Sequence, residues 1–563
     1  MVQGLKLVSG VLVLAIAAGV LLSYGHRLIM PLPVYAVDED AYAIRALFSD
    51  GAIARNAFVP PISNGLFLGI IRGVHAISQD YLPWLRLLSV AAYFGGLAAL
   101  ARVMLRGMAA PGRWTWLLVA LAFPYYRFVV AGLPEGFYVG VLAAIAVATA
   151  TLYRSRPVIH ALASGALAAG LVLLKPHGVA VVGGLLGVAV LDGLIRRDLK
   201  TMLLRIAAFA PAFFVIGNAV QWGAGEGLRA PLLFFVGDFY GRALAAHLSH
   251  GAPQQGVMNL FAMTSVVLLF AGIPIVAGLT RTVRRWRAGG QAFVPDAWDL
   301  TFAFLLLSLA ATLAMVAIYA MKVAYLPSEA FRLWGRYFEF FVPLMWLAAA
   351  PALQPWDPVA PRLARLAMAA VMLAGLAGLL LSFHWGVVLF PWDGTAVTAF
   401  FKADPARAAF HEVWPFRLIA VAATLAAAIA LAMGQSVSRV SVLHVVAIGV
   451  LATGFDHSSI QPMIQQRKDM AKDIRDAGAV VRGMPGPVAG VGIDANEADL
   501  IFVGFEGRPQ VFVWPGVSGD QARLSGFQTV VIGKDVGGLP PDRWTRVYHG
   551  RRVDVYARRP APS

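Results

Sequence analysis

Long apolar stretches separated by short polar segments dominate this sequence and restrict the folds open to it. About 20 consecutive apolar residues are needed for a helix to cross a lipid bilayer, and on that criterion we count about thirteen spans. Hydrophobic residues make up 59% of the chain and charged residues only 13%, too apolar a balance for a soluble domain. The sequence therefore predicts a polytopic α-helical membrane protein, with spans centred near residues 15, 95, 122, 145, 166, 187, 212, 268, 310, 345, 373, 425 and 448.

The first apolar run, residues 7–22, follows Lys6 and is similar in length to a signal peptide. No small-residue cleavage site follows it cleanly, because the segment "LSYGHRLIMPLP" comes next. We therefore expect a retained first helix whose N-terminus lies inside the cell.

Charge is distributed unevenly between alternate loops. The net charge is +16, but the basic residues gather in short loops, a pattern that the positive-inside rule explains without a nucleic-acid partner. These loops are expected in the cytoplasm, and the longer loops of mixed charge outside it. The expected cytoplasmic cations are Arg102, Arg106, Arg113, Arg154, Arg156, Arg196, Arg197, Lys200, Arg205, Arg281, Arg284, Arg285, Arg287, Arg362, Arg365 and Arg439. The expected outer loops are residues 25–83, 131–137, 223–257, 322–336 and 383–416, and the C-terminus lies on their side.

After about residue 457 the sequence changes character. The segment "QQRKDMAKDIRDAGAVVRGM" combines helical apolar spacing with many charges, which predicts a solvent-facing helix. Short β-rich runs follow, and "WTRVYHGRRVDVYARR" reads as a hairpin that turns at His549 and Gly550. We expect a membrane domain over residues 1–456 and a small α/β extracytoplasmic domain over residues 457–563. The chain has no cysteine, which excludes disulfides and thiolate chemistry.

Three adjacent carboxylates, Asp38, Glu39 and Asp40, follow the first apolar run. One interpretation is local: Asp40 caps a helix over "AYAIRALFSDG", which Gly51 ends. The other is functional. A lipid-linked substrate places its reacting centre at headgroup depth, where a carboxylate could act as general base on an attacking hydroxyl.

The segments "DEDAYAIRALFSDG" and "PPISNGLF" resemble the first external loop of the GT-C superfamily, integral-membrane glycosyltransferases that use polyprenyl-phosphate sugars. Aminoarabinose, mannosyl and arabinofuranosyl transferases belong to it. Aligning the acidic pair on Asp38 and Glu39 makes Asp38 the base. Aligning on "EDAY" favours Asp40, to which we lean because Tyr42 and Arg45 then fit without a gap.

Further stretches resemble family motifs on the same expected side. "VAGLPEGFYVGVL" would supply a second acidic residue, Glu135, which could equally be a first-turn acid stabilised by the helix dipole. "LWGRYFEFFVPL" would place Arg336 and Tyr337 at the lipid phosphate, although an interfacial arginine often lies beside aromatic residues. In "LLKPHG", Lys175 and His177 interrupt an apolar region, either as substrate ligands or as the end of a span.

The resemblance implies an inverting hexosyl- or pentosyltransferase of the cell envelope, in the cytoplasmic (inner) membrane. It would move a sugar from a polyprenyl-phosphate donor to a hydroxyl of a glycolipid, polysaccharide or protein on the outer face. Asp40, Asp38 and Glu39 would be catalytic; Glu135, Lys175, His177, Arg336, Tyr337, Tyr42 and Arg45 would bind substrate. No metal or other cofactor is implied, although Asp38 and Asp40 could ligate a divalent cation.

Other classes of function stay open. A transporter or flippase of lipid-linked glycans would use charges within broken helices, but most acids here fall in expected outer loops. A glycan polymerase or ligase would carry its main external loop late in the chain. A structural scaffold would use the tail to bind partners. Asp40→Asn separates a transferase, which would lose turnover, from a transporter or scaffold.

Overall fold

The structure is a computed structural model, and it divides the chain into two compact units. Unit 1 contains residues 1–26, 88–130 and 134–460, and unit 2 contains residues 27–87, 131–133 and 461–563. The expected domain division after residue 456 stays a prediction. The structure describes residues 15, 19, 23–30, 37–48, 64–223, 252–290, 293–324, 331–354, 360–390, 392–402, 414–492, 505, 509–513, 524, 526–534 and 538–559.

Helices form most of unit 1. They are α6 (Ala110–Ala122), α7 (Tyr126–Val129), α8 (Glu135–Leu152), α9 (Pro157–Leu174), α10 (Gly178–Arg196), α11 (Leu199–Gly223), α14 (Ala252–Gly289), α15 (Ala297–Lys322), α16 (Phe341–Leu353), α17 (Arg362–His384), α18 (Trp414–Ala432) and α19 (Val437–Phe455). The helix α5 (Tyr81–Met104) belongs partly to each unit. Single-turn helices η3 (Gly335–Tyr337), η5 (Ala396–Phe400) and the π-helical η6 (Asp456–Ile460) connect them.

Within the described residues, ten helical segments are long and apolar enough to cross a membrane. They are α5, α8, α9, α10, α11, α14, α15, α17, most of α18, and the segment Val437–Arg482 that begins with α19. The expected spans near residues 122 and 345 fall in α6 and α16, which have 13 residues each. Thirteen helical residues rise only about 20 Å, so these two helices are too short to cross a bilayer. Most of the run near residue 15 lies outside the described residues.

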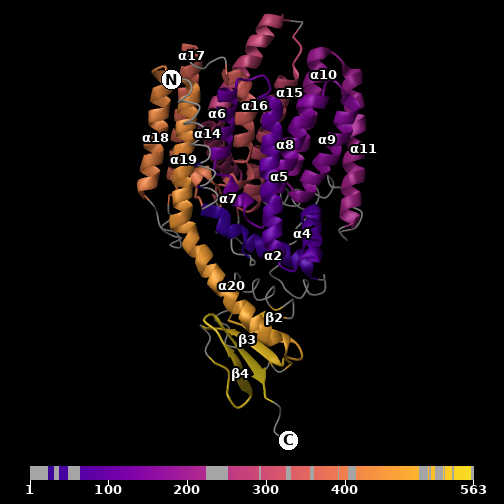
Figure 1. The fold of residues 1–563 in the computed structure, drawn as a ribbon, viewed down its shortest axis with the longest axis vertical. Helices are drawn as coiled ribbons and strands as arrows, with labels where there is room; N and C mark the ends of the chain where they lie inside the picture. Colours follow the sequence, from indigo (N-terminus) through magenta and orange to yellow (C-terminus); the bar gives the residue numbers. More distant parts are fainter. Residues whose placement is uncertain are drawn as a thin grey trace. The chain divides into compact units, whose positions relative to one another are not determined.

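Glycines and other small residues set the spacing of the unit 1 helices. A Cβ atom at Gly165 of α9 would lie 2.5 Å from the Phe209 carbonyl oxygen of α11. A Cβ at Gly184 of α10 would lie 2.1 Å from Ser308 Oγ of α15. Small residues let membrane helices approach this closely, and Figure 1 shows α8, α9, α10 and α11 side by side.

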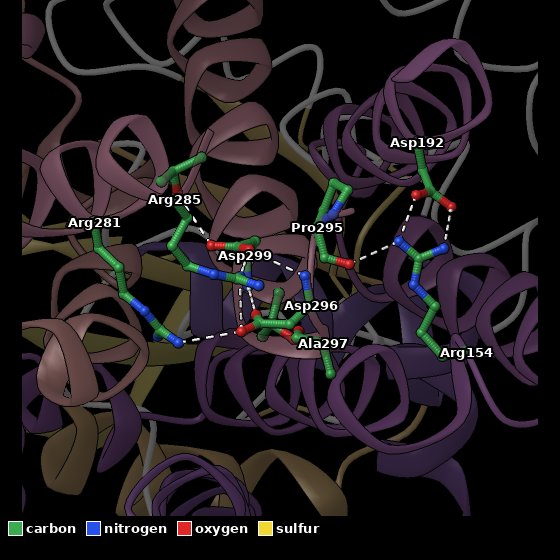
Figure 2. A network of polar contacts seen from close by, with 10 residues as sticks. Arg154, Asp192, Arg281, Arg285, Pro295, Asp296, Ala297 and Asp299 are labelled. Carbon is green, nitrogen blue, oxygen red and sulfur yellow. Dashed lines mark hydrogen bonds and ion pairs between the residues drawn. The ribbon is translucent and has the colours of Figure 1, made fainter. Parts of the chain in front are cut away.

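Charged pairs connect helix ends at loops expected in the cytoplasm, as Figure 2 shows. Asp296 caps α15 through a capping box with Asp299, and Arg285 of α14 pairs with both carboxylates. Arg154, beyond the end of α8, donates to both oxygens of Asp192 in α10, at 2.9 and 2.6 Å. These pairs neutralise acids that would otherwise be costly near the bilayer.

Unit 2 contains α2 (Val37–Leu47), α4 (Gly65–Ile77) and the tail. The tail consists of α20 (Gln461–Arg482) and five strands: β1 (Val488–Val491), β2 (Pro509–Val513), β3 (Thr529–Gly533), β4 (Trp544–His549) and β5 (Val553–Arg558). The strand order is β2-β1-β3-β5-β4. β1 pairs in parallel with β2 and β3, whereas β3–β5 and β5–β4 are antiparallel. The predicted α/β tail and its solvent-facing helix are thus confirmed.

One face of the sheet packs against α20. Ala471, Ile474, Ala477 and Val481 recur at helical spacing and form a buried cluster with strand residues that include Val531. This apolar stripe on an otherwise charged helix is the pattern expected of an amphipathic helix on a sheet.

The predicted hairpin between β4 and β5 is confirmed, and its turn is fixed to α20 by the buried carboxylate of Asp473. Asp473 Oδ1 accepts from Tyr548 Oη at 2.9 Å and from the Arg551 amide at 3.0 Å. Its Oδ2 accepts from the Arg552 and Val553 amides at 2.8 and 3.3 Å. A single acid therefore joins the helix to the turn.

Candidate active site

The acidic run lies in the first turn of α2. Because α2 begins at Val37, Asp40 lies inside the helix, and the expectation that Asp40 is its N-cap is wrong. The expected helix end at Gly51 lies outside the described residues, as do the side chains of Asp38 and Asp40.

Glu39, between these two aspartates, is an anchor within unit 2. Its Oε1 lies 3.2 Å from Arg86 Nη2 and accepts from the Gly132 amide at 2.5 Å. Arg86 also donates to the carbonyls of Arg27 and Met30, at 2.9 and 2.6 Å. Both charged side chains are buried, so their pairing is required. Oε1 of Glu39 thus has a structural task, and the catalytic role of Glu39 stays a prediction.

Tyr42 and Arg45 lie further along α2. Tyr42 is buried, and its ring meets Phe67 of α4 edge-on, with centroids 5.0 Å apart. Arg72 of α4 donates to the carbonyls of Arg45 and Ala46, at 3.3 and 2.8 Å. These contacts join α2 to α4, and the substrate-binding roles of Tyr42 and Arg45 stay predictions.

In unit 1, Glu135 is the first residue of α8 and the centre of a buried cluster. Its Oε1 accepts from Lys175 Nζ at 2.7 Å and lies 3.1 Å from Arg336 Nε. The structure therefore brings together three residues that the sequence analysis took from three separate motifs.

Two glycines fix the position of Glu135. Cβ atoms at Gly136 and Gly140 would lie 2.3 Å from Ser89 Oγ and 2.6 Å from the Ala92 carbonyl oxygen, both in α5. This Gly-x-x-x-Gly spacing lets the two backbones touch, which holds the start of α8 against α5.

Lys175 and His177 lie in the tight turn between α9 and α10. Pro176 disfavours helical geometry at the residue before it, and Lys175 is extended, with φ −150° and ψ 139°. Gly178 allows the chain to turn back at once, since a Cβ there would lie 2.5 Å from the Val172 amide nitrogen. The motif thus ends one helix, starts the next and directs two basic side chains into the protein.

Aromatic contacts complete this cluster, which we call the Glu135 cluster: Glu135, Lys175, His177, Arg336 and Tyr337. The rings of His177 and Tyr337 stack with centroids 4.2 Å apart and planes 15° apart. Lys175 Nζ lies 4.7 Å from the centre of the Tyr337 ring. Burial, followed by the charges of Lys175 and Arg336, lowers the pKa of His177 well below its usual 6.5, so the imidazole is neutral near pH 7.

Some buried polar atoms of the Glu135 cluster make no hydrogen bond within the described residues. Among the described residues, Glu135 Oε2 and both ring nitrogens of His177 are buried and have no hydrogen-bond partner. Buried polar atoms of this kind are rare, and each calls for an explanation. Two cations, one carboxylate and a neutral imidazole leave a net charge of +1. The cluster can therefore accept an anion together with groups that donate or accept hydrogen bonds.

A buried platform holds the turn η3 that carries Arg336. The Arg336 amide donates to the Asp393 carbonyl at 2.5 Å, and Tyr125 Oη donates to the Arg336 carbonyl at 3.0 Å. Glu339 accepts from the Thr395 amide and hydroxyl, at 2.5 and 2.7 Å, and from the Val397 amide at 3.1 Å. Burial raises the pKa of Glu339 against these hydrogen bonds.

This platform was not predicted from the sequence. One signal was available: Glu339 is an acid inside the apolar run "RYFEFFVPL", which is costly without partners. No local pattern points to Thr395 or Asp393, which lie more than 50 residues further along the chain.

In the part of the chain that the structure describes, no group of three or more His, Asp or Glu residues is arranged to bind a metal ion. Because the side chains of Asp38 and Asp40 lie outside that part, the expectation of a metal-independent site stays a prediction.

Fold and cluster together define a polytopic membrane protein with a buried, net-positive polar site in its helical unit and a small α/β tail. Its structure is similar to the crystal structure of ArnT from Cupriavidus metallidurans bound to undecaprenyl phosphate, with a TM-score of 0.52 and 15% sequence identity over 97% of each chain. The apo structure of the same protein gives a TM-score of 0.50 and 15% identity over 98% of each chain. The predicted polytopic helical fold with a small α/β tail is thus confirmed as a fold that this chain shares with ArnT. No protein-family model and no curated protein sequence matches the chain.

Proposed function

We propose that this protein is an inverting glycosyltransferase that moves a sugar from a polyprenyl-phosphate donor to a hydroxyl acceptor. The observation that carries the proposal is the buried pairing of Glu135 with both Lys175 and Arg336. A fold shared with a protein crystallised with undecaprenyl phosphate supports a lipid phosphate as the anion.

Lys175 and Arg336 bind the phosphate of the donor. An arginine can hold two phosphate oxygens in a fork, whereas a lysine acts as a point charge. As the bond between the anomeric carbon and the phosphate oxygen breaks, negative charge grows on that oxygen. Stabilising such charge in a site that excludes water is usually a large catalytic contribution.

Asp40, or its neighbour Asp38, acts as the general base. The acceptor oxygen attacks the anomeric carbon from the face opposite the phosphate, its proton passes to the carboxylate, and polyprenyl phosphate leaves. A single displacement of this kind inverts the anomeric configuration. Because Glu39 is held by Arg86 and Gly132, the base is assigned to one of the two flanking aspartates.

Glu135 and His177 position the donor. Glu135 Oε1 holds the two cations in place, and Oε2 accepts a hydrogen bond from a sugar hydroxyl. Neutral His177, stacked on Tyr337, offers one donor and one acceptor nitrogen to the sugar or the phosphate.

The reaction takes place at the outer face of the cytoplasmic membrane. This assignment rests on the positive-inside pattern, which also places the N-terminus in the cytoplasm and the tail outside. The acceptor, a glycolipid, polysaccharide or protein, approaches from that side.

Binding of undecaprenyl phosphate to the purified protein tests the phosphate site without knowledge of the sugar. We expect Arg336→Ala and Lys175→Ala each to weaken binding about tenfold or more, because each removes a charged hydrogen bond. Arg113→Gln, which removes an exposed cation far from the cluster in sequence, serves as matched control. Unchanged binding in both cluster variants would exclude the phosphate site.

Turnover tests the class of reaction. With undecaprenyl-phosphate pentoses and hexoses as donors, Asp40→Asn or Asp38→Asn should lower release of undecaprenyl phosphate by at least about a hundredfold, as loss of a general base predicts. A flippase or scaffold would be indifferent to both substitutions. Normal turnover in the two single variants and in the double variant would overturn the assignment of the base.

A further inference from the structure

A second polar pocket lies in unit 1, between helices α9, α10 and α11 beside the end of α8. Most of its lining is apolar, and Leu185, Leu186, Ile206 and Phe209 are among the lining residues. Tyr153, His160 and Arg205 supply polar atoms. None of these residues belongs to the Glu135 cluster.

Arg205 is the charged group of this pocket, and its side chain is buried. The guanidinium lies over the Tyr153 ring, 3.6 Å from its centre, and Nη2 donates to the Tyr153 carbonyl at 2.7 Å. Its Nη1 is buried and has no hydrogen-bond partner among the described residues. A buried cation is costly unless its donors are used, so Nη1 offers a strong interaction to an incoming anion.

The imidazole of His160 is already held by neighbouring hydroxyls. His160 Nε2 lies 3.2 Å from both Thr149 Oγ1 and Ser164 Oγ. Asp192, the acid in the neighbouring part of α10, is held by Arg154 at 2.6 Å. No carboxylate of the described residues forms an ion pair with Arg205, so the pocket retains its positive charge.

The surroundings of the pocket are those of a bilayer. Leu186 and Ile206 are half-buried at the pocket, and Leu203 and Leu194 on the same helices are each 60% exposed. Exposed Arg196 and Lys200 lie at the adjoining helix ends. Arg205 is six residues into α11, about 9 Å along the helix from its first residue, a depth suited to a lipid headgroup.

We propose that this pocket binds the phosphate of an anionic glycerophospholipid in the leaflet opposite the proposed reaction. Arg205 Nη1 donates to a phosphate oxygen, and an acyl chain lies against Ile206, Leu186 and the exposed leucines. The apolar lining favours a lipid over a soluble phosphate, and the nearby cations attract an anionic surface. The inference is independent of glycosyl transfer.

Native mass spectrometry of the full-length protein, released from nanodiscs of phosphatidylglycerol and phosphatidylcholine, tests this site. We expect the wild type to retain phosphatidylglycerol in preference to phosphatidylcholine. Arg205→Gln should reduce retention about tenfold or more, since a charged hydrogen bond is lost, and Arg205→Lys should reduce it less. The control Arg113→Gln, which removes an exposed cation from α6 on the same expected face, should stay within about twofold of wild type.

A second variant, which fills the pocket, separates loss of lipid binding from a folding defect caused by substitution of Arg205. Ala189 lines the pocket, so Ala189→Leu occupies the space and keeps the cation, and it should lose phosphatidylglycerol with an unchanged melting temperature. Retention equal to wild type in both Arg205→Gln and Ala189→Leu would overturn the proposal. If millimolar inorganic phosphate in neutral lipid stabilises wild type but not Arg205→Gln, while phosphatidylglycerol is not retained, the lipid assignment is wrong.

Discussion

Two buried carboxylates, Asp473 in the tail and Glu135 in the helical unit, organise their surroundings in different ways. Both oxygens of Asp473 are used, by three backbone amides and one tyrosine hydroxyl. Glu135 binds two cations through Oε1, while Oε2 has no hydrogen-bond partner among the described residues. A buried acid whose oxygens are all satisfied holds a fold together, whereas one with an unused oxygen retains the capacity to bind something else.

This comparison predicts opposite consequences for similar substitutions. Removing the charge of Asp473 leaves several amides without a strong acceptor, and that loss is one of stability. Removing the charge of Glu135 releases two cations that the proposed reaction needs in fixed positions, and that loss is one of rate.

Glu135→Gln should have the largest effect. The amide keeps the size of the side chain but no longer holds Lys175 and Arg336 by charge, so we expect transfer to fall about a hundredfold. Turnover with an undecaprenyl-phosphate sugar and the melting temperature are measured together. A Glu135→Gln variant that unfolds at a lower temperature but transfers sugar at the wild-type rate would show that Glu135 serves stability rather than transfer.

Asp473→Asn should destabilise the tail by about 2 kcal/mol, the scale of a lost charged hydrogen bond. Hydrogen exchange of the full chain should report faster exchange at the Arg551, Arg552 and Val553 amides. Asp469→Asn, an exposed acid on the same helix, is the matched control and should leave exchange unchanged. Equal exchange in the two variants would show that Asp473 does not hold the hairpin.

Tyr548→Phe removes one of the four hydrogen bonds to Asp473 and should cost about 1 kcal/mol. Burial, then the hydrogen bond to Asp473, raises the pKa of Tyr548 to about 12. Because the pKa in the folded state exceeds the unfolded value of about 10, this contribution to stability is complete below pH 10 and declines as the pH rises toward 12. Thermal unfolding between pH 9 and 12 should show that decline in wild type and a shallower one in Tyr548→Phe. Identical pH profiles of wild type and Tyr548→Phe would show that Tyr548 does not cause the decline in stability.

Chelation should have the smallest effect. In the proposed reaction Lys175 and Arg336 neutralise a lipid monophosphate, and the unused oxygen of Glu135 meets the sugar. Turnover in EDTA should therefore stay within about twofold of its value without chelator, since no hard-cation site is called for. If EDTA abolishes turnover and Mg²⁺ restores it, the reaction needs a divalent cation, and Asp38 and Asp40 are the candidate ligands.

Hydropathy and local motifs accounted for much of this molecule. Long apolar runs located the bilayer-length helices, because crossing lipid requires uninterrupted apolar sequence. Charges that interrupt such runs need partners, which is why Lys175 and His177 stood out, whereas Glu135 and Arg336 stood out through their resemblance to family motifs. The structure brings Glu135, Lys175 and Arg336 together. The strand runs and the hairpin at His549 and Gly550 followed from β-rich patterning and turn residues.

The structural features that could not be predicted from the sequence depend on contacts between residues far apart along the chain. The burial of α16 and the platform of Thr395 under Glu339 arise from packing, which no local period encodes. The anchoring of Glu39 likewise depends on Arg86 and Gly132, 47 and 93 residues away.

The anchoring of Glu39 has a consequence for how the sequence of this loop could diversify. The ion pair with Arg86 fixes the rotation of α2 about its axis. Inserting or deleting one residue in the acidic triplet would therefore move an aspartate into the position that faces Arg86 and move Glu39 out of it. Substitutions of one carboxylate for another within the triplet should thus be tolerated, whereas a change in its length should not. Related loops of a different length should carry a compensating change at the position of Arg86.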